Sequence, residues 1–171
     1  MPLTKRADRK GWRRDKGPRV VKGLLEAAIS PTSPHATVRL FGSQAKGKAY
    51  ERRLGRELER RIEKGLWDEA ELIKGPWIKF RDANGPGYAQ PDFLILSPSL
   101  MCILDAKLTH TEIARRQLLS LYLPLCSAIW PGRLTLCVEV CHNPGTGSGF
   151  LVELEDCLEE EKDLYVWHWL G

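Results

Sequence analysis

The spacing of apolar positions along the chain alternates between a helical period and a strand period. Over about residues 46–64 an apolar side chain recurs at every fourth position. This stripe consists of Tyr50, Leu54, Leu58 and Ile62. It predicts an amphipathic helix, with Ser43 as its N-cap and Gly65 just after its last turn.

Two further helices are predicted from local signals. A short helix is expected over residues 20–29, closed before Pro31. Thr109 and Glu112 resemble a capping box that starts a helix running to about residue 123. Pro124 should kink or end this helix, since proline has no backbone N–H to donate.

Several segments carry the alternating or continuous apolar pattern of β-strands. The predicted strands are 77–82, 93–96, 100–104, 133–140 and 163–170. The stretches 83–88 and 142–149 are rich in glycine and are expected to be turns or loops. This order of elements predicts an α/β (mixed α+β) fold, with a central mixed β-sheet flanked by helices.

The composition favours a soluble globular protein, with 43% hydrophobic and 28% charged residues. No apolar run is long enough to cross a bilayer, and the basic N-terminus lacks the apolar stretch of a signal peptide. We therefore expect a cytoplasmic protein with no membrane partner. The five cysteines form no Cys-x-x-Cys pair and match no common zinc pattern, which favours free thiols.

The positive charge of the chain is concentrated at its N-terminus. Residues 1–22 hold nine of the 26 lysines and arginines but only two of the 22 acids. They are expected to form a flexible basic arm, and residues 23–171 a single domain. Such an arm either contacts nucleic acid or is a solvated tail. Candidate DNA contacts are Lys5, Arg6, Arg9, Lys10, Arg13 and Arg14 in the arm, and Lys46, Lys48, Arg115 and Arg116 beyond it.

Charged residues stand at the open end of the predicted hairpin, where its two strands meet again. Folding the hairpin about Pro98 places Asp92 opposite Leu104, and a shift of one residue makes Asp92 and Asp105 direct neighbours. Lys107 then projects from the same face as Asp105. Two adjacent carboxylates repel each other, and a hard divalent cation such as Mg²⁺ or Mn²⁺ relieves that repulsion.

Such a site suits the hydrolysis of a phosphodiester bond. The cation would act as a Lewis acid, while Lys107 would position or activate a water molecule or neutralise the pentavalent phosphorane. The simpler alternative is a surface salt bridge between Asp105 and Lys107, with Asp92 in a turn after Pro91.

These residues resemble the PD-(D/E)xK nuclease superfamily. Pro91-Asp92 is similar to the first half of its motif, and Asp105-Ala106-Lys107 to the second. Two further matches are Glu51 in GKAYERRLGREL, as the acid on a preceding helix, and Gln117 in ARRQLLSLY, as the glutamine on the following one. The resemblance covers about residues 47–122 and implies a restriction-endonuclease-like fold.

The resemblance also implies roles for each matched residue. Metal ligands would be Glu51, Asp92, Asp105 and the main-chain carbonyl of Ala106. Lys107 would be catalytic, and Gln117 would orient the substrate or support the metal shell. Two of these matches have an alternative explanation. Glu51 can instead pair with Lys48 or Arg52, and Gln117 can be a surface residue.

The sequence departs from the superfamily pattern in two places. Asp105 stands where glutamate is commoner, and Gln117 and Tyr122 are one step too far apart for the Q-x-x-x-Y of RecB-like exonucleases. The helix that carries Glu51, the small single domain and the basic N-terminal arm are more similar to archaeal-type Holliday junction resolvases.

The resemblance therefore implies a Mg²⁺-dependent DNA endonuclease acting on branched recombination or repair intermediates. Such a resolvase would act as a homodimer, because it needs two active sites. The alternatives are an exonuclease on linear DNA ends and a catalytically inactive DNA-binding module on the same fold.

Overall fold

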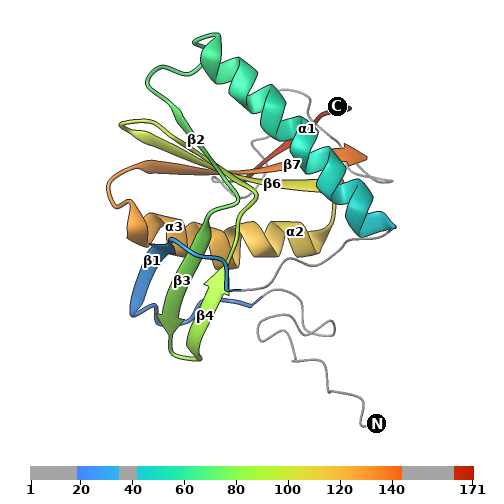
Figure 1. The fold of residues 1–171 in the computed structure, drawn as a ribbon. Coiled ribbons are helices and arrows are strands. Elements are labelled where there is room, and N and C mark those ends of the chain that lie inside the picture. Colours follow the sequence, from blue (N-terminus) through green and yellow to red (C-terminus); the bar gives the residue numbers. More distant parts are fainter. Residues whose placement is uncertain (1–18, 35–41, 144–163) are drawn as a thin grey trace, which may run out of the picture.

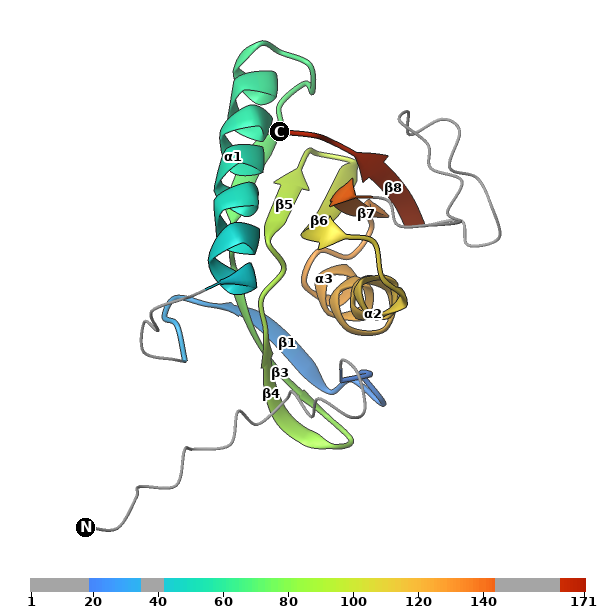
Figure 2. The ribbon, with the colours of Figure 1, turned by 90° about the vertical axis from the view of Figure 1, so that its right-hand side faces the viewer.

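A five-stranded mixed β-sheet forms the middle layer of the protein, with helices on both of its faces (Figures 1 and 2). The computed structural model describes residues 19–34, 42–143 and 164–171. The order of strands in this sheet is β2-β5-β6-β7-β8. Their bounds are Glu71–Lys74 (β2), Phe93–Leu96 (β5), Leu100–Thr109 (β6), Leu134–Asn143 (β7) and Leu164–His168 (β8). The predicted mixed α/β class, with helices flanking a mixed sheet, is confirmed.

The sheet is antiparallel on one side of β6 and parallel on the other. β2 and β6 both run antiparallel to β5, whereas β6, β7 and β8 are parallel to one another. A parallel step needs a crossover connection, and the helices between β6 and β7 provide it. Strand β2 has no counterpart among the predicted strands, since its four residues are too few for a clear alternation.

The strands of this sheet bury side chains on both faces, as their near-continuous apolar sequences require. On β5, Phe93 packs on the side of helix α1, while Leu94 packs on the side of the crossover helices. On β6, Leu104 and Ile103 divide in the same way. The two hydrophobic clusters therefore lie on opposite faces of one sheet.

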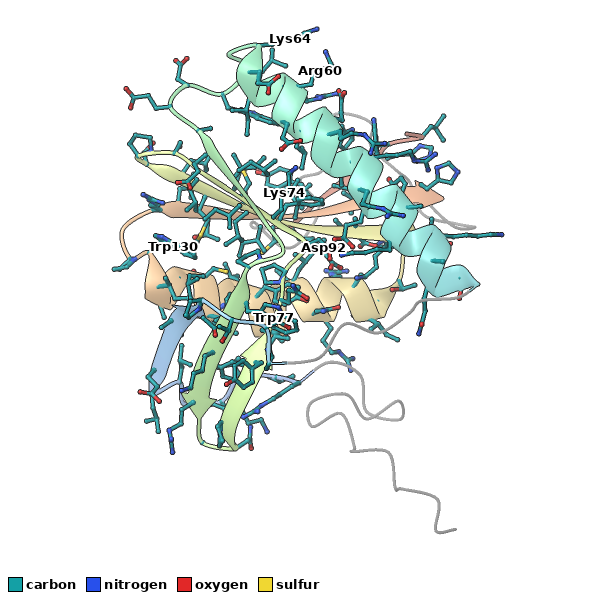
Figure 3. All side chains as sticks on the ribbon, viewed as in Figure 1. Arg60, Lys64, Lys74, Trp77, Asp92 and Trp130 are labelled. Carbon is teal, nitrogen blue, oxygen red and sulfur yellow. The ribbon has the colours of Figure 1, made fainter. Side chains whose placement is uncertain are left out.

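Helix α1 (Ser43–Glu63) covers one face of the sheet with its apolar stripe. The predicted stripe is confirmed: Tyr50, Leu54 and Leu58 are fully buried, and Ile62 is partly buried against the same cluster. Gly65 has a φ of 72°, as expected after a last turn. The predicted N-cap is wrong, because Gly42 occupies that position and Ser43 is already helical. Arg60 and Lys64 mark the end of the helix that lies farthest from Asp92 (Figure 3).

The crossover between β6 and β7 is one helical run of three parts. These are α2 (Glu112–Gln117), the π-helix η1 (Leu118–Tyr122) and α3 (Leu123–Ile129). The cap is Thr111, whose side chain accepts a hydrogen bond from the Ala114 N–H. The predicted capping by Thr109 is wrong, because β6 continues through that residue.

Pro124 does not end the helical run, contrary to one of the two expected outcomes, because it lies at the start of α3. In a regular α-helix the carbonyl of Ser120 would accept a hydrogen bond from residue 124, but proline has no N–H. The backbone N–H of Val21 donates to that carbonyl at 3.0 Å instead. The carbonyl that Pro124 leaves without a helical donor therefore receives a hydrogen bond from a distant segment of the chain.

A second, three-stranded antiparallel sheet lies below the crossover helices in Figure 1. Its strand order is β1-β3-β4, with bounds Glu26–Ser30 (β1), Trp77–Asp82 (β3) and Gly85–Ala89 (β4). The strand at 77–82 is confirmed. The predicted helix over 20–29 is wrong, because pairing with β3 draws residues 26–30 into a strand.

The predicted loop at 83–88 is also wrong in its larger part. Asp82 pairs with Gly85, so only Ala83 and Asn84 form the turn. Gly87 packs against the ring of Phe80, since an added Cβ would lie only 2.7 Å from a ring carbon. Glycine at this position thus marks close packing within a strand.

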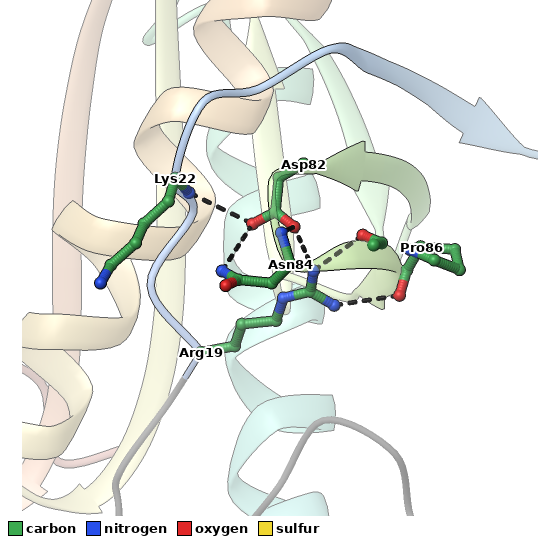
Figure 4. A network of polar contacts seen from close by, with 6 residues as sticks. Arg19, Lys22, Asp82, Asn84 and Pro86 are labelled. Carbon is green, nitrogen blue, oxygen red and sulfur yellow. Dashed lines mark hydrogen bonds and ion pairs between the residues drawn. The ribbon is translucent and has the colours of Figure 1, made fainter.

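Asp82 joins the small sheet to the segment that precedes it (Figure 4). Its buried carboxylate makes an ion pair with Arg19 and accepts hydrogen bonds from the backbone N–H groups of Lys22 and Asn84, at 3.2 and 2.9 Å. Arg19 also donates to the carbonyls of Gly85 and Pro86. Burial alone would raise the pKa of Asp82, but these hydrogen bonds together lower it.

Some of the remaining predictions concern described residues, and others concern residues outside the described ranges. Cys102, Cys126, Cys137 and Cys141 are free thiols, as predicted, and Cys157 lies outside the described residues. The final strand is confirmed as β8, and β7 extends past its predicted end into the expected loop. Residues 1–18 of the basic arm, including its six candidate DNA contacts, and 144–149 of that loop also lie outside. Among described residues, no helix has the length and apolarity to span a membrane.

We expect Asp82→Asn to lower the free energy of unfolding by about 2–3 kcal/mol at neutral pH, because the buried Arg19 contact loses its counter-charge. The pKa of Asp82 is below its ordinary value of 3.8. Its stabilisation is thus complete above that value and is lost as the pH falls through the lowered pKa. Urea denaturation at about pH 7 and about pH 3 measures this, and the difference between the proteins should shrink in acid.

Glu26→Gln is the control, since it removes an exposed ion pair with Arg81 on the same sheet. Its effect should stay below about 1 kcal/mol. Equal losses in both variants would contradict the role assigned to Asp82.

Candidate active site

Asp92 and Asp105 face each other at the open end of the β5–β6 hairpin. Phe93 pairs with Leu104, so the next position of each strand places these two acids opposite one another. This is the one-residue shift from the simple fold about Pro98. The carboxylate Oδ2 of Asp92 accepts a hydrogen bond from the Ala106 N–H at 2.7 Å, which fixes that side chain against β6. Figure 3 shows Asp92 between α1 and the crossover helices.

Lys107 lies on the same face as Asp105, as strand alternation requires. Its Nζ is 2.7 Å from Oδ2 of Asp105. The Asp105 side chain is only 1% exposed, whereas that of Lys107 is 31% exposed. The ammonium group therefore contacts the buried acid and also reaches the surface, where a substrate would arrive.

Glu51 approaches the same group from α1. Its side chain is partly buried and makes an ion pair with Lys48, one of the expected alternatives. The charges of Asp92 and Lys107 also act on Glu51, since Asp92 raises its pKa and Lys107 lowers it. Glu51 thus lies close enough to respond to the charges of Asp92 and Lys107, and it keeps Lys48 as its surface partner.

Glu139 is an acid of this site that sequence reasoning missed. It pairs with Asp105 across the parallel β6–β7 ladder and is fully buried. Its Oε2 is 2.8 Å from Nδ1 of His110, and its Oε1 has no hydrogen-bond partner in the described part of the chain. The available signal was a single acid between Val138 and Val140, in the otherwise apolar run 136–141.

The surroundings of the site oppose the ionisation of all its carboxyl groups at once. Burial raises the pKa of Asp105 to about 7; Lys107 opposes this change and Asp92 adds to it. Burial also raises the pKa of Glu51 and of Glu139, the latter against the attraction of His110. Asp105 and Glu139 thus lie buried beside Lys107 and His110, while Glu51 is paired with Lys48.

The pKa of Lys107 is raised as well, but by a different cause. Burial lowers it, but the facing carboxylates of Asp105 and Asp92 outweigh burial and raise the pKa above its ordinary value. Lys107 therefore stays protonated at neutral pH.

Gln117 is buried in this region, so its surface alternative is wrong. Its Nε2 donates to the hydroxyl of Tyr122, which donates in turn to the Gln90 carbonyl at 2.9 Å. The five-residue spacing is too long for two side chains on one face of an α-helix, but a π-helix turns once in about that interval. Helix η1 thus brings together two residues that the sequence places one step too far apart.

The remaining predicted contacts do not join the acids. Arg115 and Arg116 lie on α2, where Arg116 is exposed and Arg115 partly buried. Lys46 lines a separate hollow beside α1. Ala106 packs its side chain against the α1 cluster, and its N–H is the group that binds Asp92.

The donor chemistry of the site fits a hard divalent cation. Asp92 Oδ1 has no hydrogen-bond partner among the described residues, and the buried Asp105 Oδ2 is contacted by Lys107 alone. Mg²⁺ binds through one or two carboxylates and keeps several waters. No group of three or more histidine, cysteine or acidic side chains with metal-binding geometry occurs in the described ranges. The fit therefore rests on two carboxylates and not on a complete protein cage.

Comparison with protein-family models, with curated proteins and with solved structures gives no match for this chain.

We expect Asp105→Asn to raise the free energy of unfolding by about 1–2 kcal/mol at about pH 8 in EDTA. Asp105 has a pKa near 7 in the folded protein and an ordinary value of 3.8. A raised folded pKa contributes stability below the ordinary value, and this is lost as the pH rises through 7.

At about pH 5 the two proteins should be similar, because Asp105 is then neutral, like the amide. Chemical denaturation at both pH values tests this expectation. Asp82→Asn is the matched control, since it neutralises a buried aspartate but should destabilise. A loss of stability at pH 8 in Asp105→Asn would show that its charge is well compensated.

Proposed function

We propose that this protein is a metal-dependent DNA nuclease of the PD-(D/E)xK type, with a restriction-endonuclease-like fold and a cytoplasmic location. The observation that carries the proposal is the convergence of Asp92, Asp105 and Lys107 at one end of the β5–β6 hairpin. Two carboxylates and a lysine that reaches the surface are the groups that phosphodiester hydrolysis with a divalent cation requires.

Asp92 and Asp105 would hold Mg²⁺ or Mn²⁺, with the Ala106 carbonyl and Glu51 as further donors. The bound cation would polarise the phosphate and lower the pKa of a water molecule. It would also offset the burial of charge and the repulsion from Asp92, which together raise the pKa of Asp105 and Glu51. An excess of buried negative charge is thus a reason for the cation to bind here.

Lys107 serves as a fixed positive charge rather than as a base. Burial lowers its pKa, but the carboxylates of Asp105 and Asp92 raise it above its ordinary value, which favours an ammonium group that donates to a phosphate oxygen. As the water oxygen bonds to phosphorus and the bond to the leaving oxygen breaks, negative charge grows on the phosphoryl oxygens. The ammonium group would stabilise that charge.

Glu139 and His110 would support this arrangement from the neighbouring strand. Glu139 lies beside Asp105 in the sheet and contacts His110 at 2.8 Å. It adds negative charge around Lys107 and fixes the imidazole near the C-terminal end of β6. Such supporting contacts typically affect metal affinity or activity by about 10–100-fold.

A second candidate function is exonuclease action on linear DNA ends. The contact between Gln117 and Tyr122 favours it, because η1 produces the side-chain arrangement expected from the Q-x-x-x-Y spacing of RecB-like exonucleases. A third, an inactive DNA-binding module, is motivated by the arginine-rich surface of α1, which includes Arg52, Arg53 and Arg56. The same substrate panel separates the three.

We expect Asp105→Ala and Lys107→Ala each to reduce DNA cleavage at least about 10²–10³-fold while DNA binding is retained. Cleavage is measured on linear, nicked and four-way junction DNA, with and without Mg²⁺ or Mn²⁺. Lys79→Ala, an exposed residue of β3, is the control and should cut normally. Normal cleavage by both site variants would refute the assignment.

The substrate profile then identifies the activity. Paired symmetric nicks in the junction would identify an endonuclease on branched DNA that acts as a homodimer with two sites. Progressive shortening of linear DNA would identify an exonuclease. Binding without cleavage in either metal would identify the inactive module.

We expect Glu139→Gln to reduce cleavage by about 10–100-fold and to raise the Mg²⁺ concentration needed for half-maximal rate. The amide keeps the size of the side chain but removes its charge next to Asp105. Titration of Mg²⁺ at fixed DNA concentration measures the effect. An unchanged rate and metal requirement would make Glu139 a structural residue only.

A further inference from the structure

A second feature of the surface is a basic groove beside the first half of α1. It has a volume of about 630 Å³. Its polar lining consists of Lys46, Arg52, Arg53 and Arg56 from α1 and His142 from β7, with Leu108 of β6 among the apolar groups. Among the residues that the structure describes, no acidic side chain contributes to the lining, so the described lining gathers positive charge.

The cations of the groove differ from those at the other end of the same helix. Near the C-terminal end of α1, Arg60 and Arg61 both make ion pairs with Glu57, and Lys74 pairs with Glu59. In the groove, Lys46, Arg52 and Arg56 have no carboxylate partner among the described residues. Arg53 lies over the ring of Tyr50, with its guanidinium carbon 5.9 Å from the ring centroid.

Unpaired arginines in one groove repel each other, and an anionic ligand relieves that repulsion. The guanidinium group matches phosphate with two parallel hydrogen bonds, and it loses its own hydration more readily than an ammonium group does. The volume lies within the range of about 300–1,000 Å³ typical of small-molecule sites. The groove is therefore larger than one phosphate needs, and suits a phosphate together with its sugar.

The groove and the candidate active site lie at the same end of the sheet. Leu108 follows Lys107 directly on β6, and strand alternation turns the two side chains to opposite faces. On α1, Arg52 follows Glu51 directly. The groove and the acids thus lie on opposite faces of β6 near its C-terminal end, so a continuous chain of phosphates passing that end can reach both.

We propose that this groove binds the sugar–phosphate backbone of the nucleic-acid strand, next to the bond that lies at the acids. The statement about the adjacent bond rests on the proposed nuclease function, whereas the binding of the backbone does not. Arg52 and Arg56, one helical turn apart, contact successive phosphates. The groove thereby sets which bond of a strand reaches Asp105 and Lys107.

The double variant Arg52→Gln/Arg56→Gln tests the proposal. Its matched control is Lys64→Gln/Lys79→Gln, which removes the same charge from exposed positions outside the groove. Affinity for labelled single-stranded and duplex oligonucleotides is measured in EDTA over a range of salt concentrations. Circular dichroism confirms that α1 is intact, and glutamine and arginine have similar helix propensities.

We expect the groove variant to bind at least about tenfold more weakly than the control. Each lost phosphate contact should lower the slope of log affinity against log salt by about 0.9 on duplex and about 0.7 on single strands. Equal weakening in both double variants would overturn the proposal, as would a parent protein that binds no oligonucleotide. A mononucleotide that binds as tightly as the oligonucleotide would also overturn it, since the groove would then be a nucleotide pocket.

Failure of the groove and failure of the nuclease give different results. If the parent protein cuts DNA and the groove variant cuts it with an unchanged KM and unchanged cut positions, the groove is wrong and the nuclease stands. If no cleavage occurs in any metal but the groove variant alone loses affinity, the binding site stands and the nuclease is wrong. We expect a raised KM, a largely unchanged kcat and displaced cut positions.

Discussion

The hydrogen bond from the Ala106 N–H to the Asp92 carboxylate is the contact on which the site depends. It joins the start of β5 to the far end of β6 and extends the hairpin ladder by one side chain. A slip of one residue in this pairing would turn every side chain of a strand to the other face of the sheet. Asp105 and Lys107 would then point into the hydrophobic cluster under α1.

The two hydrophobic clusters hold that register. Phe93 and Leu104 pack on the α1 face, and Leu94 and Ile103 pack on the crossover face, so each strand is specified from both sides. The acids occupy the one end of the sheet where this packing gives way to surface. Burial there raises the pKa of Asp105 to about 7, so part of the stability won by packing is given up to keep the carboxylates together.

The sequence predicted the elements whose signals are local. The stripe of Tyr50, Leu54 and Leu58 required only a period of four, and the hairpin required only two apolar runs and a turn. The strands β1 and β4 were missed because pairing with β3 decides their conformation, against weak local preferences.

The predicted part of the site shows the same division. Alternation alone placed Asp105 and Lys107 on one face, and hairpin pairing brought Asp92 to them. Glu139 could not be placed, because its neighbour in the sheet is set by the crossover at residues 110–133, whose register no local pattern records. The contact of Gln117 with Tyr122 was also hidden, since a π-helix has no clear sequence signature.

The interrupted helix has a mechanical consequence for the N-terminal segment. Val21 is bound to the Ser120 carbonyl, and Arg19 two residues earlier is bound to Asp82. Ser120 is in turn only two residues from Tyr122, which contacts Gln117 and Gln90. The hydrogen bond between Val21 and Ser120 therefore ties residues 19–22 directly to the helical run that carries Gln117 and Tyr122.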